Sequence, residues 1–397
     1  MSLHTQEIET AFEAHLENVA KYERLMSATR SINATCRVPS NDRAGLEMIA
    51  QSLDVEVVST EGLAEMVKSA AKAMQDSFSR VLETLSIWVD KTGRKETARL
   101  RRKLEELHGE PAVKQISDRN LADSLSVDGR LVLDHTHTAQ ELDQLTNAFT
   151  DEYIPDITQR DYEIWSLMDK GGLLGWRGKP DNIHSVLVNI IRFLASNKEP
   201  NMPLMGQGMD KVIGDRSVFK KAAVVRDMSY AKLSSDSEAQ TLIKRYTEDK
   251  RYVNGRRAAR KGTGVARVGV VPVLSVSELS SAVDAMTQIC DTIERTVAIR
   301  KQTRGELRQL SYVRVLVGSF NTSEILNVVE TDGTTSQREV FKLDEADRQR
   351  TDLIVRYVSR DIYDSIKIIM VLSDLQIGAW GAIRDHVGES LNSYRSP

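Results

Sequence analysis

The sequence predicts a mainly α-helical protein, built from long amphipathic helices with a small β element in the C-terminal half. An α+β fold is the second choice. Three observations lead to this prediction. Apolar residues recur three and four positions apart over long stretches. Ser235 with Glu238 and Ser275 with Glu278 form capping boxes, which open helices. Strand-like patterns are confined to a few short runs.

The clearest helical pattern follows Val57. Its apolar positions fall on one helix face, and they are Leu63, Met66, Val67, Ala70, Ala73, Met74, Phe78, Val81, Leu82, Leu85, Trp88 and Val89. A basic helix, Leu85 to Leu107, comes next. Between residues 91 and 103 it carries seven basic side chains against one acid, Glu96. The stretch contains nothing that resembles an active site.

The segment before this pattern is acidic. Residues 5–30 are expected to form one helix and residues 44–53 a second, with an extended connector at residues 54–60. The first 61 residues carry ten acidic and five basic side chains, a net of −5. Because the whole chain carries −3, the remaining residues sum to +2. Such asymmetry is typical of a removable tail or a partner contact, and a solvated acidic helix is the plainer alternative.

Further helices are predicted downstream at residues 139–168, 183–195, 278–310 and 344–394. Val265 to Leu274 is the best strand candidate. Two or three short strands are expected within residues 312–343, around the turn Asp332-Gly333. We divide the chain into an acidic helical segment (1–61), an amphipathic then basic helix (62–108), a mixed helical middle domain (109–262) and a C-terminal helical domain with short strands (263–397).

Catalytic and cofactor motifs are missing. The chain lacks G-x-S-x-G, C-x-x-C and the phosphate-binding G-x-x-x-x-G-K-[ST] pattern. Its seven histidines are scattered, except for His135 and His137, which we interpret as part of a solvated loop and not as metal ligands. We therefore expect no catalytic residue, no metal and no cofactor, and a protein that is not an enzyme. No apolar run is long enough for a transmembrane helix, so no membrane contact is expected.

A second basic cluster spans Lys244 to Arg267, with Tyr246 and Tyr252 among the bases. Such clusters can neutralise phosphates, and the alternative is a solvated loop or a contact with an acidic protein. The candidate contacts to DNA or to a partner are Arg94, Lys95, Arg99, Arg101, Arg102, Lys103, Lys244, Arg245, Arg256, Arg257, Arg260 and Lys261.

The order of these segments resembles the internal head proteins of giant tailed bacteriophages. That resemblance implies an acidic helical propeptide, which a prohead protease cuts after Ser/Ala-x-Glu. Ser59-Thr60-Glu61 fits the motif, and Gly62 would become the new N-terminus. Residues 11–13 and 139–141 fit it too. They lie in predicted helices, however, and helices must unfold locally before they are cut.

The resemblance implies a structural protein of the head interior, processed during head maturation and packaged with the genome. Its expected partners are the prohead protease, other head proteins and, without sequence preference, genomic DNA. Before assembly it would reside in the cytoplasm of the bacterial host. One alternative is an injected phage protein that acts on a host target. An unrecognised enzyme is the other.

Overall fold

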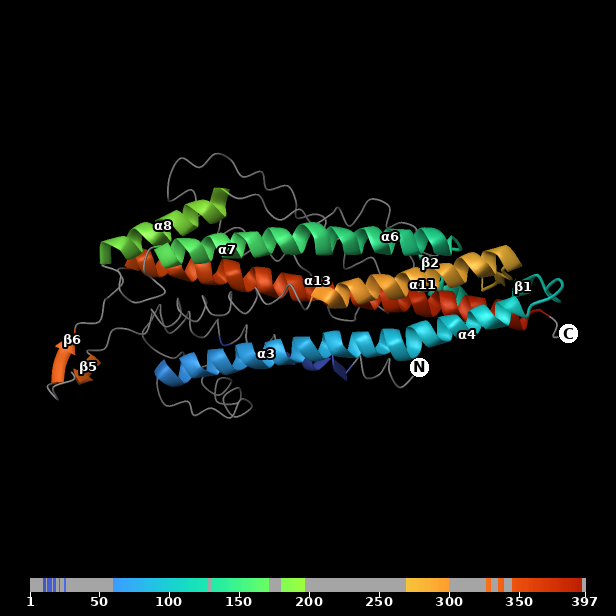
Figure 1. The fold of residues 1–397 in the computed structure, drawn as a ribbon, viewed down its shortest axis with the longest axis horizontal. Helices are drawn as coiled ribbons and strands as arrows, with labels where there is room; N and C mark the ends of the chain where they lie inside the picture. Colours follow the sequence, from blue (N-terminus) through green and yellow to red (C-terminus); the bar gives the residue numbers. More distant parts are fainter. Residues whose placement is uncertain are drawn as a thin grey trace.

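Long helices lie side by side in an elongated bundle (Figure 1). The structure is a computed structural model. It describes residues 10–11, 13–15, 17–18, 21, 25, 60–127, 130–170, 180–196, 269–299, 326–329, 335–338 and 345–394. The mainly helical fold with small β elements is confirmed.

Among the described residues from Thr60 onward, five helical rods build the bundle. The first comprises α3 (Thr60–Trp88), the π-helical turn η1 (Val89–Gly93) and α4 (Arg94–Glu105). The second comprises α6 (His135–Asn147), the π-helical turn η2 (Ala148–Tyr153) and α7 (Ile154–Lys170). The other three are α8 (Pro180–Ser196), α11 (Val276–Ala298) and the 48-residue α13 (Glu345–Asn392). A short helix, α5 (Arg119–Ser124), lies between the first two rods in the chain.

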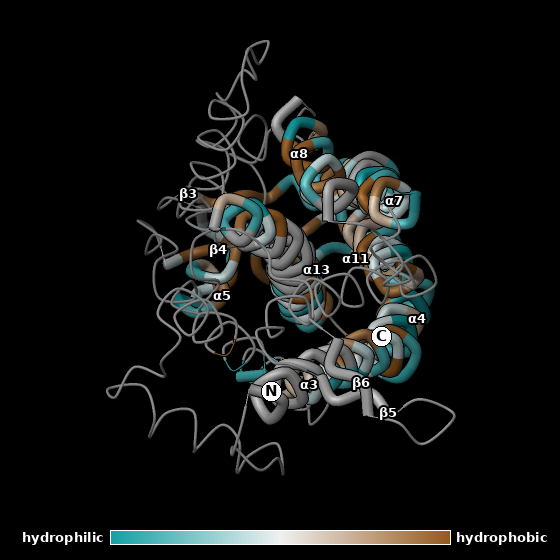
Figure 2. The backbone as a smooth tube through the Cα atoms, turned by 90° about the vertical axis from the view of Figure 1, so that its left-hand side faces the viewer, coloured by the Kyte–Doolittle hydropathy of each residue, from teal (hydrophilic) through white to brown (hydrophobic). Residues whose placement is uncertain are grey.

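Long-range contacts show which rods run in opposite directions. Arg94 contacts Asp291 while Arg101 contacts Asp284, so α4 is antiparallel to α11. Pairing of Thr146 with Gln376 and of Arg160 with Tyr357 sets α6–α7 antiparallel to α13. Seen along the bundle (Figure 2), α13 occupies the middle, with α8, α7, α11 and α3–α4 around it.

One buried cluster fills the interior. It draws on all four predicted segments, as Leu25, Leu82, Leu142 and Ile289 illustrate. At its centre the indole of Trp88 on α3 meets that of Trp380 on α13 edge to face, with ring centroids 5.1 Å apart. The long hydrophobic helix predicted at the C-terminus is therefore α13.

Three helix starts carry side-chain caps, of which the Ser275 capping box was predicted. Ser275 caps α11 in a capping box: its backbone N–H donates to Glu278 Oε2 at 2.8 Å, and its hydroxyl accepts from the Glu278 N–H. Asp118 caps α5, and Asp134 caps α6 by accepting from the His137 N–H at 2.8 Å. These caps satisfy N–H groups that have no partner within the helix.

Strand pairs are short and antiparallel. The hairpin of β5 (Leu326–Val329) and β6 (Thr335–Arg338) surrounds the predicted turn, whose residues lie outside the described part of the chain. Both strands fall within residues 312–343, where short strands were predicted. The predicted Val265–Leu274 strand is described from residue 269 onward, and there β4 (Val271–Pro272) pairs with β1 (Gln115–Ile116). The third pair is β2 (Ser126–Val127) with β3 (Arg130–Leu131).

Candidate functional site

The predicted cleavage junction lies at the start of α3. Ser59 is outside the described residues, and residues 60–62 form the first turn of the helix. The expected extended connector is thus wrong at Thr60, because α3 begins three residues before Leu63. The alternative match at residues 139–141 lies inside α6. A first turn lacks part of the helical hydrogen bonding and opens more easily than a helix interior.

Two of the predicted basic contact residues bind the neighbouring helix. Arg94 Nη2 lies 2.9 Å from Asp291 Oδ1 and 2.5 Å from Glu294 Oε2 on α11. Seven residues further on, Arg101 Nη2 lies 2.6 Å from Asp284 Oδ1. The pKa of Arg94 is raised, chiefly by its hydrogen bond to Glu294. Sequence reasoning missed the acidic edge of α11, although its seven-residue spacing matches that of the two arginines.

The remaining predicted contact residues on α4 form no ion pair with α11. Arg99 is ion-paired with Glu96 on its own helix, and its hydrogen bond lowers the pKa of that carboxyl. Lys95, Arg102 and Lys103 are exposed and form no ion pair within the described residues.

Two of the unpaired bases point away from the core, and the third borders a pocket. Lys95 and Arg102 are seven residues apart and share one side of α4, opposite the buried Leu100. Lys103 borders a polar pocket of about 400 Å³ between α4, α5 and the end of α13. Arg384, Asp118 and Glu389 also line it, so the pocket carries both signs of charge. The second basic cluster, including Lys244, Arg245, Arg256, Arg257, Arg260 and Lys261, lies outside the described residues.

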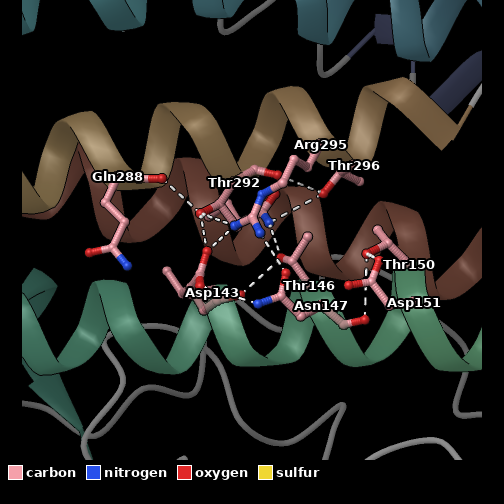
Figure 3. Close-up of polar contacts among 11 residues, drawn as sticks. Asp143, Thr146, Asn147, Thr150, Asp151, Gln288, Thr292, Arg295 and Thr296 are labelled. Carbon is pink, nitrogen blue, oxygen red and sulfur yellow. Dashed lines mark hydrogen bonds and ion pairs between the residues drawn. The ribbon is translucent and has the colours of Figure 1, made fainter.

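A polar layer joins α6 to α11 (Figure 3). Arg295 on α11 forms an ion pair with Asp143 and donates to Asn147 Oδ1 at 2.5 Å, both on α6. Thr292 also reaches Asp143, at 3.4 Å. From α13, the buried Gln376 donates to Thr146 Oγ1 at 2.8 Å. This layer fixes the relative register of three helices, since sliding any of them would bury unpaired polar groups.

The predicted solvated loop at the histidine pair is wrong. His135 is the first residue of α6 and is buried against α13, where its Nε2 lies 2.9 Å from Nδ1 of His386. The Nε2 of His386 lies 2.9 Å from the Pro272 carbonyl oxygen, which can only accept. His386 must therefore carry its proton on Nε2, so His135 Nε2 donates to His386 Nδ1. The histidine pair was assigned to a loop because residue types that cap helices, such as Asp134, also favour turns.

Burial controls the protonation of both rings. Desolvation, reinforced by the charge of His386, lowers the pKa of His135 from 6.5 to about 3. Desolvation also lowers the pKa of His386. The pair is thus a neutral, hydrogen-bonded link between α6, α13 and β4, and not a catalytic base exposed to a substrate. Among the described residues, no group of three or more His, Cys, Asp or Glu side chains could hold a metal ion.

Comparison with known families decides the identity of the chain. The family model described as phiKZ-like phage internal head proteins matches residues 23–310. This match covers more than half of the chain. The chain belongs to this family. Neither a curated protein nor a solved structure matches it.

The matched region of this internal head protein includes the predicted junction, the basic helix and α11. The sequence resemblance to giant-phage internal head proteins is thereby confirmed, and a place in the head interior follows from the family. Among the helices that the structure describes, none has the length and apolar character needed to span a membrane.

Proposed function

We propose that this internal head protein is a structural component of the phage head that is packaged with the genome and trimmed by the prohead protease. The observation that carries the proposal is the family match over residues 23–310. Its partners would be the protease and other head proteins, which it would meet in the host cytoplasm before assembly. Residues 1–61 would be the propeptide. Their removal would change the net charge from −3 to +2.

The proposed cut falls between Glu61 and Gly62. In virions carrying Glu61→Gln, we expect the chain to remain uncut, because glutamine keeps the shape of the side chain but lacks the carboxylate that the protease would read. Intact-mass analysis of purified virions distinguishes a chain that begins at Gly62 from the full-length chain. A shortened chain in the Glu61→Gln virions would assign the cut elsewhere.

The helical first turn adds a graded control. Alanine favours a helix over glycine by about 1 kcal/mol, with serine in between. If the turn must open before cleavage, Gly62→Ala should be cut several-fold more slowly than the parent chain, and Gly62→Ser should fall between them. Equal rates for all three would mean that opening of this turn does not limit cleavage.

A second part of the proposal is weak, sequence-independent DNA binding by the processed chain. Lys95, Arg102 and Lys103 support it, since they are exposed and form no ion pair within the described residues, and the first two share the outer side of α4. Arg94 and Arg101 are already neutralised by α11. Phosphate contacts release counterions, so the affinity should fall steeply as salt rises.

Basic side chains of α4 with and without an ion pair to α11 provide a matched test. In the processed chain, the double change Lys95→Gln and Arg102→Gln should weaken DNA binding and reduce the slope of log affinity against log salt by about 2. The double change Arg94→Gln and Arg101→Gln removes the same two charges from the same helix, but from ion pairs with α11, and should leave the slope nearly unchanged. Titrations with a DNA duplex at low and moderate salt measure both. Negligible binding by the full-length and processed chains alike, or equal effects of the two changes, would contradict DNA contact by α4.

A further inference from the structure

The described part of the acidic leader is helical and lies against α3 (dark blue in Figure 1). The Nδ1 atom of His15 lies 2.7 Å from the Ser77 hydroxyl oxygen. The Asn18 amide donates to the Ala73 carbonyl oxygen at 3.4 Å. Because a later leader residue meets an earlier residue of α3, the two helices run antiparallel.

This contact is part of the core and not a loose surface association. His15 and Leu25 are both 0% exposed. The His15 ring packs on Phe78, with centroids 5.6 Å apart, and Phe78 is itself buried. Ala73 and Ser77 are small and one helical turn apart, which lets another helix come close. A buried polar pair among apolar side chains fixes the register of the leader helix against α3.

The contact between the leader and α3 is distant from the proposed cut. Ser77 follows Gly62 by fifteen residues, or ~22 Å along a helix. Hydrolysis of the bond after Glu61 would therefore remove none of the contacts between His15, Asn18 and α3. Cutting the chain and freeing this side of α3 are separate events.

We propose that the side of α3 formed by Ala70, Ala73, Ser77 and Phe78 is a helix-binding surface, and that the leader remains bound to it after the chain between them is cut. Its ligand is a helix that presents a histidine and an asparagine three residues apart beside apolar side chains. The surface becomes free for other head components only when the leader dissociates. This inference extends the proposed processing, but it rests on contacts in the uncut chain.

The test uses the full chain with a recognition sequence for a site-specific protease inserted after Pro39, in the predicted break between the leader helices. After complete digestion, size-exclusion chromatography and native mass spectrometry should find the leader fragment and the remainder as one complex at micromolar concentration. Immediate separation of the two pieces would overturn the inference. Because the phage protease is not used, this outcome is independent of whether cleavage at Glu61 occurs.

Two variants test the two sides of the contact between the leader and α3, and a third provides the control. His15→Ala removes the buried ring, and Ser77→Leu adds bulk to the opposite side. Each should accelerate release of the fragment at least tenfold. Glu17→Ala is the matched control, since Glu17 is 69% exposed and pairs with Lys21 on its own helix. Circular dichroism before digestion verifies folding in each variant. Release of the leader fragment at the control rate in both His15→Ala and Ser77→Leu would refute this surface. Retention in Ser77→Leu but loss in His15→Ala would refute the proposed α3 side of the contact.

Discussion

Replacing Trp380 by alanine is expected to lower the free energy of unfolding by about 3–5 kcal/mol, the typical cost of deleting a buried aromatic side chain. Trp380 is 2% exposed, and its ring meets Trp88 across α3 and α13. The guanidinium of Arg384 covers the same ring, 5.6 Å from its centroid. The substitution would leave a cavity where the longest helix joins the helix that carries the leader. Chemical denaturation followed by circular dichroism measures the loss.

Two further substitutions separate cavity formation from loss of an aromatic group in general. Trp380→Phe keeps an aromatic ring against Trp88 and should cost less than Trp380→Ala. Tyr162→Ala removes a side chain that is 53% exposed, and should change stability by about 0.5 kcal/mol or less. A Trp380→Ala protein as stable as Tyr162→Ala would place Trp380 outside the core.

Acidification is expected to destabilise the fold through the His135–His386 pair. A folded-state pKa near 3 against 6.5 for His135 means that the unfolded chain binds the proton more tightly. The stabilisation that the neutral His135 adds to the free energy of unfolding is complete above pH 6.5 and is lost progressively as the pH falls toward 3. At 1.36 kcal/mol per pKa unit, the full loss is on the order of 5 kcal/mol. A proton on Nδ1 of His386 would also face the N–H of His135.

The informative window lies between pH 6.5 and 5, where most carboxylates stay ionised. The parent chain should lose stability there with a slope of up to about 1.4 kcal/mol per pH unit for this histidine. In His135→Gln, the amide can still donate to His386 but does not titrate, so the slope should be smaller. His108→Gln, at an exposed position, serves as the control. An equal slope in all three proteins would mean that His135 does not govern the response to acid.

The sequence alone located the long helices of the described chain, whereas the short α5 was not predicted. Burial on one side of a helix repeats every 3.6 residues, and caps act within four residues, so both are written locally. This is why the capping box of Ser275, the start of α11 and the course of α13 were predicted. The order of acidic leader, amphipathic helix and basic helix also indicated the family, which the match over residues 23–310 confirms.

Short strands and the exact helix start were less predictable. A strand of two residues, such as β1, has no alternating pattern to detect. Its pairing with β4 depends on bringing residue 116 next to residue 271. The start of α3 at Thr60 was missed because Val55, Val57 and Val58 favour extended structure, and a sequence pattern defines the end of a helix only to within a residue or two.

The tertiary structure decided which charges are free and which histidines are buried. Arg94 and Arg102 are alike in sequence, but one meets Asp291 almost 200 residues later and the other faces outward. His135 was assigned to a loop because its partner, His386, is 251 residues away. The leader was recognised by its charge, whereas its binding to α3 depends on the contact of His15 with Ser77. Local sequence sets the periodic pattern of each helix, and only packing determines which faces meet.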